Sequence, residues 1–252
     1  GNYNTAVGTS SLGANTTAAN NTAVGQASLA ANTTGAENTA IGANALDANT
    51  TAQRNTAVGH NNMTATTTGS YNSALGNQVL LVNTVGTENS AVGYRAMDAN
   101  TEGSYNVAMG VNALGGNTTA DNNVAVGFGA MIANTTGDKN TAVGMNSLAA
   151  NTTGTQNTSL GFKSLDANTT ASDNTAIGKS SMGANTTGAS NTAVGMQSLA
   201  ANTTASDNTA VGYDSLLTNT TGAENTSVGS FSMRLNTTGS YNSAVGRLAL
   251  RR

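Results

Sequence analysis

The sequence predicts an all-β protein, a β-solenoid in which each turn is one 17-residue repeat. Two observations support this prediction. A glycine recurs every 17 residues from Gly8 to Gly246, in fifteen copies without insertion or deletion. Apolar residues also keep a fixed place relative to that glycine, which distinguishes the chain from low-complexity disorder. We therefore expect residues 1–252 to form a single array of about fifteen rungs. Because the chain begins and ends in mid-pattern, we expect it to be part of a longer one.

Each rung is expected to begin with a short strand, as in Asn191 to Gly195. The first residue of this segment is Asn in all fifteen copies, and the third is Ala except at Ser159 and Ser227. The residue before the glycine is always Val, Ile, Leu or Met. Thr-Ala-Val favours β structure, whereas Asn and Gly tolerate positive φ angles. The segment therefore predicts a strand with a corner at each end.

The second half of the rung is expected to contain another extended stretch. The fourth residue after the glycine is always Leu or Met, and it stands in a Ser-Leu-x-Ala pattern in several copies. A second Asn follows seven residues after the glycine in thirteen of fourteen copies, with Thr66 as the exception. A Gly or Ala three residues later closes the unit. This half predicts a second leg and a second corner.

Stacking in register places identical side chains above one another at about 4.8 Å. The Leu/Met column then becomes an apolar spine, and the asparagines become ladders of amides. We interpret these asparagines as structural corners instead of ligand-binding groups. The residues so assigned are Asn4, Asn21, Asn38, Asn140, Asn191 and Asn242.

The strand also predicts self-association. Neighbouring side chains such as Ala142 and Val143 point to opposite faces, yet both columns are free of charge in all fifteen copies. One face can pack inside its own turn, and the other needs a second chain. The small Ala favours close approach near a symmetry axis, so Ala142 and Ala193 are the candidate trimer interface. The alternative is that Ala fills a narrow corner.

The recurring Asn-Thr/Ser-Ala-Val/Ile-Gly, with Ser/Ala-Leu a few residues later, resembles the head repeats of YadA-like trimeric autotransporter adhesins and the similar repeats of phage tail fibres. The resemblance covers the whole chain. It implies a left-handed parallel β-roll, assembled as a homotrimer and displayed outside a cell or on a virion. The repeat is longer than the adhesin repeat and contains an added Asn-Thr-Thr-Gly segment.

Composition argues against several other classes of protein. The net charge is −3 and charged residues make up 8% of the chain, so no nucleic-acid surface is expected. Cysteine is absent, and no apolar run is long enough to insert into a membrane. The single histidine, His60, lies in a variable column, and the carboxylates form no acid/base pair at a suitable spacing. We expect a protein that is not an enzyme and has no cofactor or metal.

Recognition is expected at the column that follows the glycine, because its residues vary most. We call it the recognition column; its candidate residues are Tyr94, Phe128, Phe162 and Tyr213. Exposed aromatic rings there suit a host or neighbouring cell-surface glycan or protein, and the alternative is scattered surface residues. The predicted function is an adhesive or structural segment of an extracellular or virion fibre. An ice-binding solenoid that uses its Thr columns remains the alternative.

Overall fold

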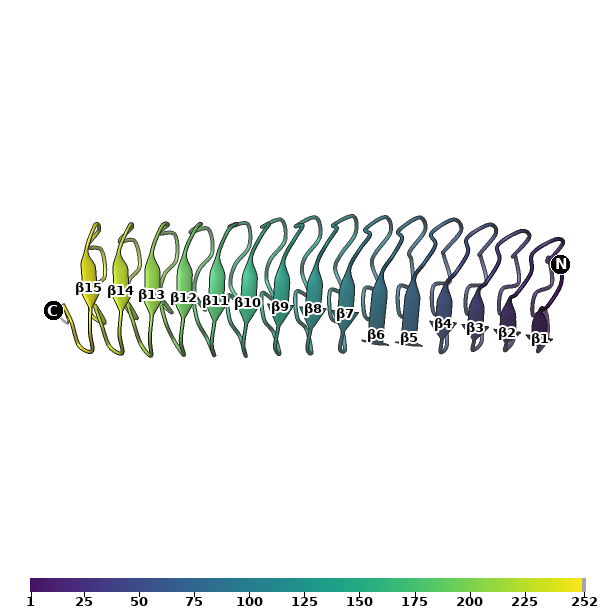
Figure 1. Cartoon of the computed structure of the whole chain (residues 1–252), viewed down its shortest axis with the longest axis horizontal. Helices are drawn as coiled ribbons and strands as arrows, with labels where there is room; N and C mark the ends of the chain where they lie inside the picture. The colour runs from purple at the N-terminus through teal and green to yellow at the C-terminus, as the bar shows by residue number, and fades with distance from the viewer. Residues whose placement is uncertain (251–252) are drawn as a thin grey trace. The chain divides into compact units, whose positions relative to one another are not determined.

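The computed structural model describes residues 1–250. Within them the secondary structure is entirely β strands and turns, and each unit below is a parallel β-solenoid with about 17 residues to a turn. The chain divides into two compact units, Gly1–Asn123 and a second that begins at Val124. Figure 1 labels the strands.

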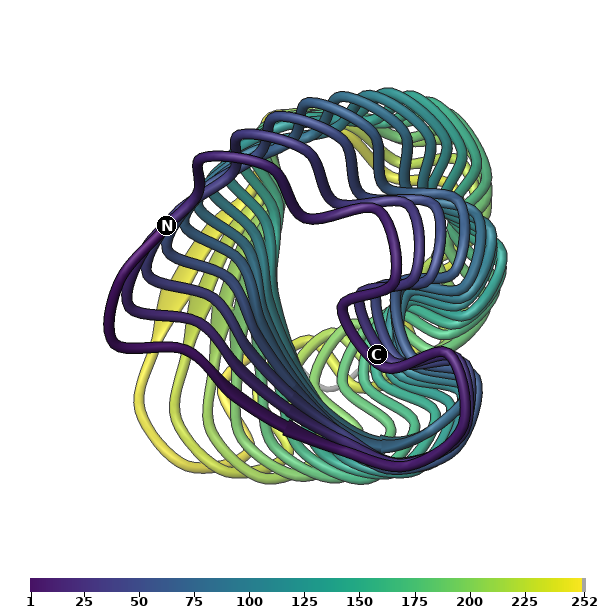
Figure 2. The ribbon, with the colours of Figure 1, turned by 90° about the vertical axis from the view of Figure 1, so that its right-hand side faces the viewer.

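The first unit holds seven strands, each in register with the next. Every pair is parallel, and equivalent residues of successive repeats pair, as Thr5 does with Thr22. Figure 2 shows these turns end-on, in purple to teal. The strands are β1 (Thr5–Val7), β2 (Thr22–Val24), β3 (Thr39–Ile41), β4 (Thr56–Val58), β5 (Ser73–Asn77), β6 (Ser90–Tyr94) and β7 (Val107–Met109).

The second unit holds eight strands that pair in the same parallel, in-register way. In Figure 1 they run from teal through green to yellow. They are β8 (Val124–Val126), β9 (Thr141–Val143), β10 (Thr158–Leu160), β11 (Thr175–Ile177), β12 (Thr192–Val194), β13 (Thr209–Val211), β14 (Thr226–Val228) and β15 (Ser243–Val245).

The expected second strand of each rung is absent from the described residues, and that prediction is wrong. A series of turns takes its place. Ser147 N–H donates to the carbonyl oxygen of Gly144 at 3.2 Å, and Asn146, the third residue of this turn, has a φ of 53°. Leu148 also has a φ of 53°. Successive rungs still bond through this leg, since Leu148 N–H donates to the carbonyl oxygen of Ser164 at 3.0 Å.

Each turn packs its core from two columns. The side chains of the Ala column and the Leu/Met column are buried in nearly every rung, and both Ala142 and Leu148 are 0% exposed. Where Ser159 replaces Ala, its hydroxyl bonds to Ser147 Oγ at 2.7 Å and Ser164 Oγ at 2.6 Å. The Val column lies on the opposite, outer side of the strand.

The corner asparagines form a hydrogen-bonded ladder. The backbone N–H of Asn38 donates to Asn21 Oδ1 at 2.9 Å, and Asn21 Nδ2 donates to the carbonyl oxygen of Gly35 at 2.9 Å. The same two bonds recur in unit two, where Asn208 N–H donates to Asn191 Oδ1 and Asn191 Nδ2 donates to the carbonyl oxygen of Ala205. These amides are buried and serve both their own rung and the next. The ladder includes Asn4, Asn21, Asn38, Asn140, Asn191 and Asn242.

The second asparagine column forms another ladder, in which amides bond directly to amides. Asn49 Nδ2 donates to Asn32 Oδ1 at 2.7 Å and to the carbonyl oxygen of Ala52 at 3.1 Å. Asn38 Nδ2 donates to the same Ala52 oxygen at 2.9 Å, so the two ladders converge on one carbonyl. This shared acceptor fixes the closing corner of the rung.

The recurring glycine is required by its backbone. Gly144 has a φ of 132°, and a Cβ on it would lie 2.5 Å from the carbonyl oxygen of Gly161 in the next rung. A side chain would therefore be strained and would push two rungs apart. The recurrence of the glycine follows from the stacking of one turn on the next.

Candidate interaction surface

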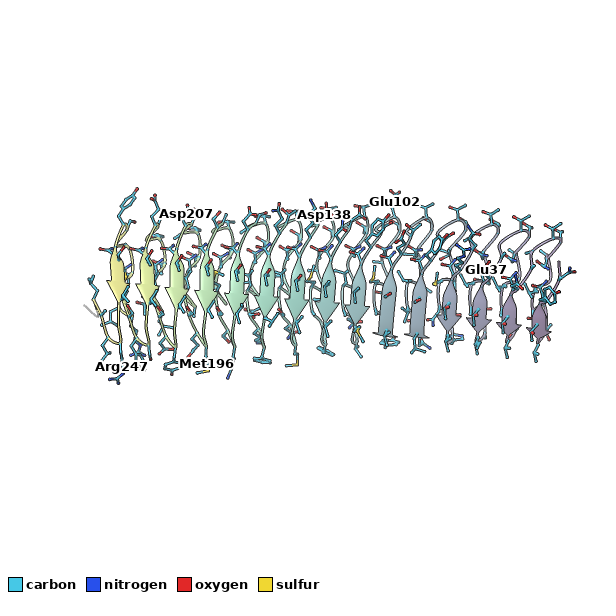
Figure 3. The ribbon with its side chains drawn as sticks, in the orientation of Figure 1. Glu37, Glu102, Asp138, Met196, Asp207 and Arg247 are labelled. Carbon is cyan, nitrogen blue, oxygen red and sulfur yellow. The ribbon has the colours of Figure 1, made fainter. Side chains whose placement is uncertain are left out.

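The recognition column lies on the outer side of each strand. In β6 the side chains of Ser90, Val92 and Tyr94 are exposed, whereas that of Ala91 is buried. In β5 and β6 the strand continues through the glycine, so there the recognition column points the same way as the Val column. Figure 3 shows Met196 and Arg247, two members of this column in the second unit, at one edge of the strands, with Asp138 and Asp207 at the opposite edge.

The structure places all four candidate recognition residues at exposed positions. The exposed fractions are 48% for Tyr94, 55% for Phe128, 39% for Phe162 and 41% for Tyr213. Two of the rings have a cation beside them: Arg95 Cζ lies 5.9 Å from the Tyr94 ring centre, and Lys163 Nζ lies 5.9 Å from that of Phe162. Cations in this arrangement interact favourably with the ring face. The column therefore presents aromatic and charged groups together.

The structure corrects the assignment of the candidate trimer interface. Ala142 and Ala193 are 0% exposed in the single chain because their side chains face the core of their own turn. A side chain enclosed in this way cannot contact a partner. The alternative, that Ala fills a narrow interior, agrees with its position. The face left for a partner carries the Val column, whose members are half-buried or exposed.

The outer side of the first unit also carries an exposed chain of polar contacts across three rungs. Arg54 Nε donates to Glu37 Oε2 at 2.8 Å, and Arg54 donates a second bond to the Tyr71 hydroxyl at 2.8 Å. Bonding to Glu37 raises the pKa of Arg54 above its ordinary value. Exposed pairs of this kind contribute little to stability.

The carboxylates of the described residues do not gather into a group that could hold a metal ion. No cluster of three or more His, Cys, Asp or Glu side chains occurs within the described part of the chain. Burial raises the pKa of Asp47, Asp98 and Asp166, which share one position in the repeat. Their rungs are separated by others, so these residues are not brought together. His60 is exposed.

A cluster of side chains in the last three rungs was not predicted from the sequence. Phe231 meets Tyr213 edge-on with ring centres 5.1 Å apart, and Arg234 Cζ lies 5.3 Å from the Phe231 ring centre. Arg234 Nε also pairs with Asp214 Oδ2 at 3.4 Å. The available signal was local: Asp214, Phe231 and Arg234 bring charge or bulk to positions that are mostly small or polar in other rungs.

No protein-family model, curated protein or solved structure matches this chain. Residues 1–250 contain no helix with the length and apolar character needed to cross a bilayer.

Proposed function

We propose that the chain is a non-enzymatic structural and adhesive segment of an extracellular or virion fibre, assembled as a homotrimer of left-handed rolls. The observation that carries this proposal is the Val column. It is apolar in all fifteen repeats, although its side chains lie on the outer face of the sheet.

The Val column is exposed in the single chain, which supports the proposal that another surface covers it. In the first unit Ile41 is 40% exposed and Leu75 51%, and in the second Leu160 is 41% exposed and Val245 75%. A strand face that meets water normally carries polar residues. A column that excludes them in every rung is explained if a second surface covers it. Identical chains provide such a surface, since the same column on each copy can meet around a symmetry axis. Three copies follow from the resemblance to YadA-like head repeats.

The recognition column suits the edge of that interface. It includes polar and charged residues such as His60, Asn77 and Lys179 among its aromatic ones, as the rim of an interface does. We assign it the contact with a cell-surface glycan or protein. No role in nucleic-acid binding or membrane insertion is proposed for this segment, and no cofactor.

Ice binding is the second candidate, and one structural observation favours it. Thr and Val point outward together from strands such as β9, β12 and β13, so Thr hydroxyls and Val methyls form regular ranks on the sheet. Ranks of this kind at the regular spacing of stacked strands can order water.

Two measurements on the intact chain separate these functions. Light scattering at micromolar concentration gives the mass of the particle, and thermal hysteresis reports ice binding. A particle of three chains without hysteresis supports the fibre. A monomer with hysteresis moves the assignment to ice binding, and a monomer without hysteresis contradicts both.

A further inference from the structure

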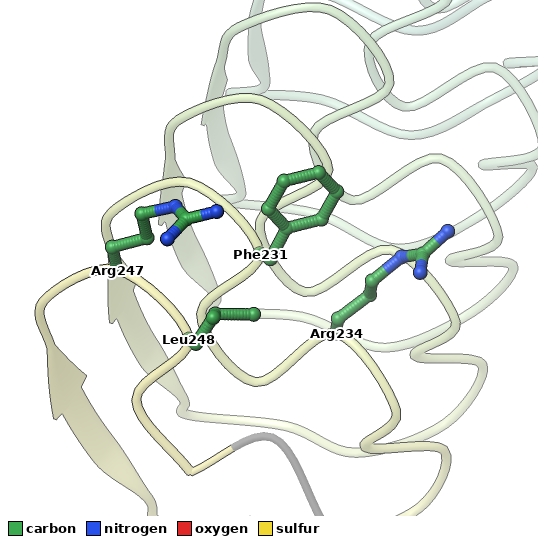
Figure 4. A pocket seen from close by; sticks show the side chains of 4 residues that line it. All are labelled: Phe231, Arg234, Arg247 and Leu248. Atoms are coloured by element: carbon green, nitrogen blue, oxygen red, sulfur yellow. The ribbon is translucent and has the colours of Figure 1, made fainter.

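A cavity of about 240 Å³ lies on the surface of the second unit, between its last rungs. It is lined by Phe231, Arg234, Arg247 and Leu248. Figure 4 shows Phe231 between the two arginines, with Leu248 beside it. The cavity thus combines two cationic groups with an aromatic ring and an aliphatic side chain.

One wall of the cavity is held in place before any ligand binds. Phe231 is supported edge-on by Tyr213, and Arg234 lies against the Phe231 ring. Arg234 is anchored in turn by Asp214, whose side chain is 4% exposed. A wall fixed by its own contacts loses little freedom when a ligand arrives.

The other side of the cavity carries a cation that is available for a ligand. Arg247 is exposed, and no carboxylate of residues 1–250 pairs with it. The charge of Arg234 is offset by Asp214, so the cavity keeps one uncompensated positive charge. A guanidinium binds a carboxylate through two parallel hydrogen bonds, which makes a carboxylate its natural partner.

We propose that this cavity binds one carboxylate-bearing sugar ring, that is, a uronic acid or a similar acidic sugar. Arg247 takes the carboxylate, and the C–H face of the ring packs on Phe231 and Leu248. The volume lies just below the range of about 300 to 1,000 Å³ for drug-sized ligands, so it suits a single ring. This inference rests on the proposed function only in taking the sugar to come from a cell surface.

The charge of the whole chain favours this ligand over a long polyanion. The net charge of the chain is −3. The second unit, which holds the cavity, also carries the carboxylates Asp207 and Glu224 in two consecutive rungs. A nucleic acid or another polyphosphate would need an extended basic surface, which residues 1–250 do not present. One carboxylate beside an apolar wall matches the charge and the lining.

The test is a titration of the intact chain, followed by NMR, with galacturonate and with galactose, which has the same ring without the carboxylate. We expect saturable, millimolar binding of galacturonate and at least tenfold weaker binding of galactose. Arg247→Gln and Phe231→Ala should each weaken galacturonate binding by roughly tenfold or more. The matched control is Lys179→Gln, which removes an exposed cation from the same column four rungs away and should leave binding unchanged.

Three outcomes would overturn the proposal. They are equal binding of both sugars, equal binding of acetate and galacturonate, and a loss of binding in Lys179→Gln as large as in Arg247→Gln. Circular dichroism confirms that each variant is folded. Light scattering on the same samples keeps the two proposals apart: trimers that bind no galacturonate contradict only the sugar site, and monomers that bind it contradict only the fibre.

Discussion

Thr66 shows how closely each asparagine depends on its neighbours in the next rungs. The second ladder has Asn at this position in the other thirteen copies. The Thr66 hydroxyl donates to the carbonyl oxygen of Asn83 at 2.9 Å. The Thr66 hydroxyl does not bond to the Asn49 side-chain amide in the preceding rung. Asn49 Oδ1 is therefore buried without a hydrogen-bond partner among residues 1–250. An acceptor left in this state costs about 1–3 kcal/mol.

Thr66→Asn should repair the ladder. The new amide can donate to Asn49 Oδ1, as Asn100 Nδ2 does to Asn83 Oδ1 at 2.8 Å. We expect the first unit to gain about 1 kcal/mol, measured by denaturant unfolding and by slower hydrogen exchange in the adjacent rungs. The reverse change, Asn100→Thr, is the control and should destabilise by a similar amount. A Thr66→Asn variant no more stable than the parent would show that the orphaned oxygen carries no cost.

Asp47 is predicted to make stability depend on pH. Burial raises the pKa of its carboxyl, and the Oδ1 atom has no hydrogen-bond partner within the described residues. The folded state therefore holds this proton more firmly than the unfolded state, so stability is lost as pH rises through the folded pKa. Asp47→Asn should raise the unfolding temperature at pH 7 and give no gain below the ordinary Asp pKa of 3.8. Asp207→Asn, at an exposed position, is the control. An equal gain at both pH values would argue against charge burial.

At the scale of the element, the sequence predicted one leg of the rung and missed the other. The Thr-Ala-Val strand and its two corners follow from β propensity and from Asn and Gly, and the structure confirms a strand in every rung. The Leu/Met leg was expected to be extended, and a positive φ costs a residue such as Leu about 1–2 kcal/mol. Leu148 nevertheless adopts a φ of 53°. Full burial of its side chain offsets that cost, and such a trade is visible only once the rung is closed.

The candidate surface was predictable to a similar degree. Variability pointed to the recognition column, whose aromatic residues are exposed. The orientation of the strand was not predictable, because Ala and Val are both apolar and nothing local states which of them faces the core. The cavity at Phe231 and Arg247 was also missed, since it combines residues from adjacent rungs.

Leu148→Ala tests how far damage spreads along the stack. Leu148 is 0% exposed, so its loss should cost about 2–5 kcal/mol. In a solenoid each rung contacts mainly its neighbours, and the effect should therefore be confined to nearby rungs. Hydrogen exchange should accelerate around β9 and β10 and stay unchanged near β14. Exchange that is unaltered everywhere would contradict a core role for this column.

At the scale of the whole molecule, the two faces of each strand have separate roles. The Ala column fills the interior of the turn, and the Val column stays apolar on the outside, beside a recognition column that varies freely. Internal packing explains the first column fully. Internal packing does not explain the Val column, because polar residues in place of Val would leave the packing of the core unchanged. We propose association between copies as the reason for the difference.

Ala142 and Val143 allow the two roles to be tested at adjacent positions of one strand, β9. Val143→Lys leaves the interior untouched and places one charge from each copy in the proposed interface, where unpaired charges cost several kcal/mol. We expect its mass in light scattering to fall to that of one chain while its β circular dichroism is retained. Ala142→Glu puts a carboxylate in the core of its own turn, so β structure should be lost as well. Val143→Ile, which keeps the face apolar, should behave as the parent. A Val143→Lys variant that still forms trimers would place the interface elsewhere. A monomeric parent would contradict the trimer and favour ice binding as the role of the outer Val column.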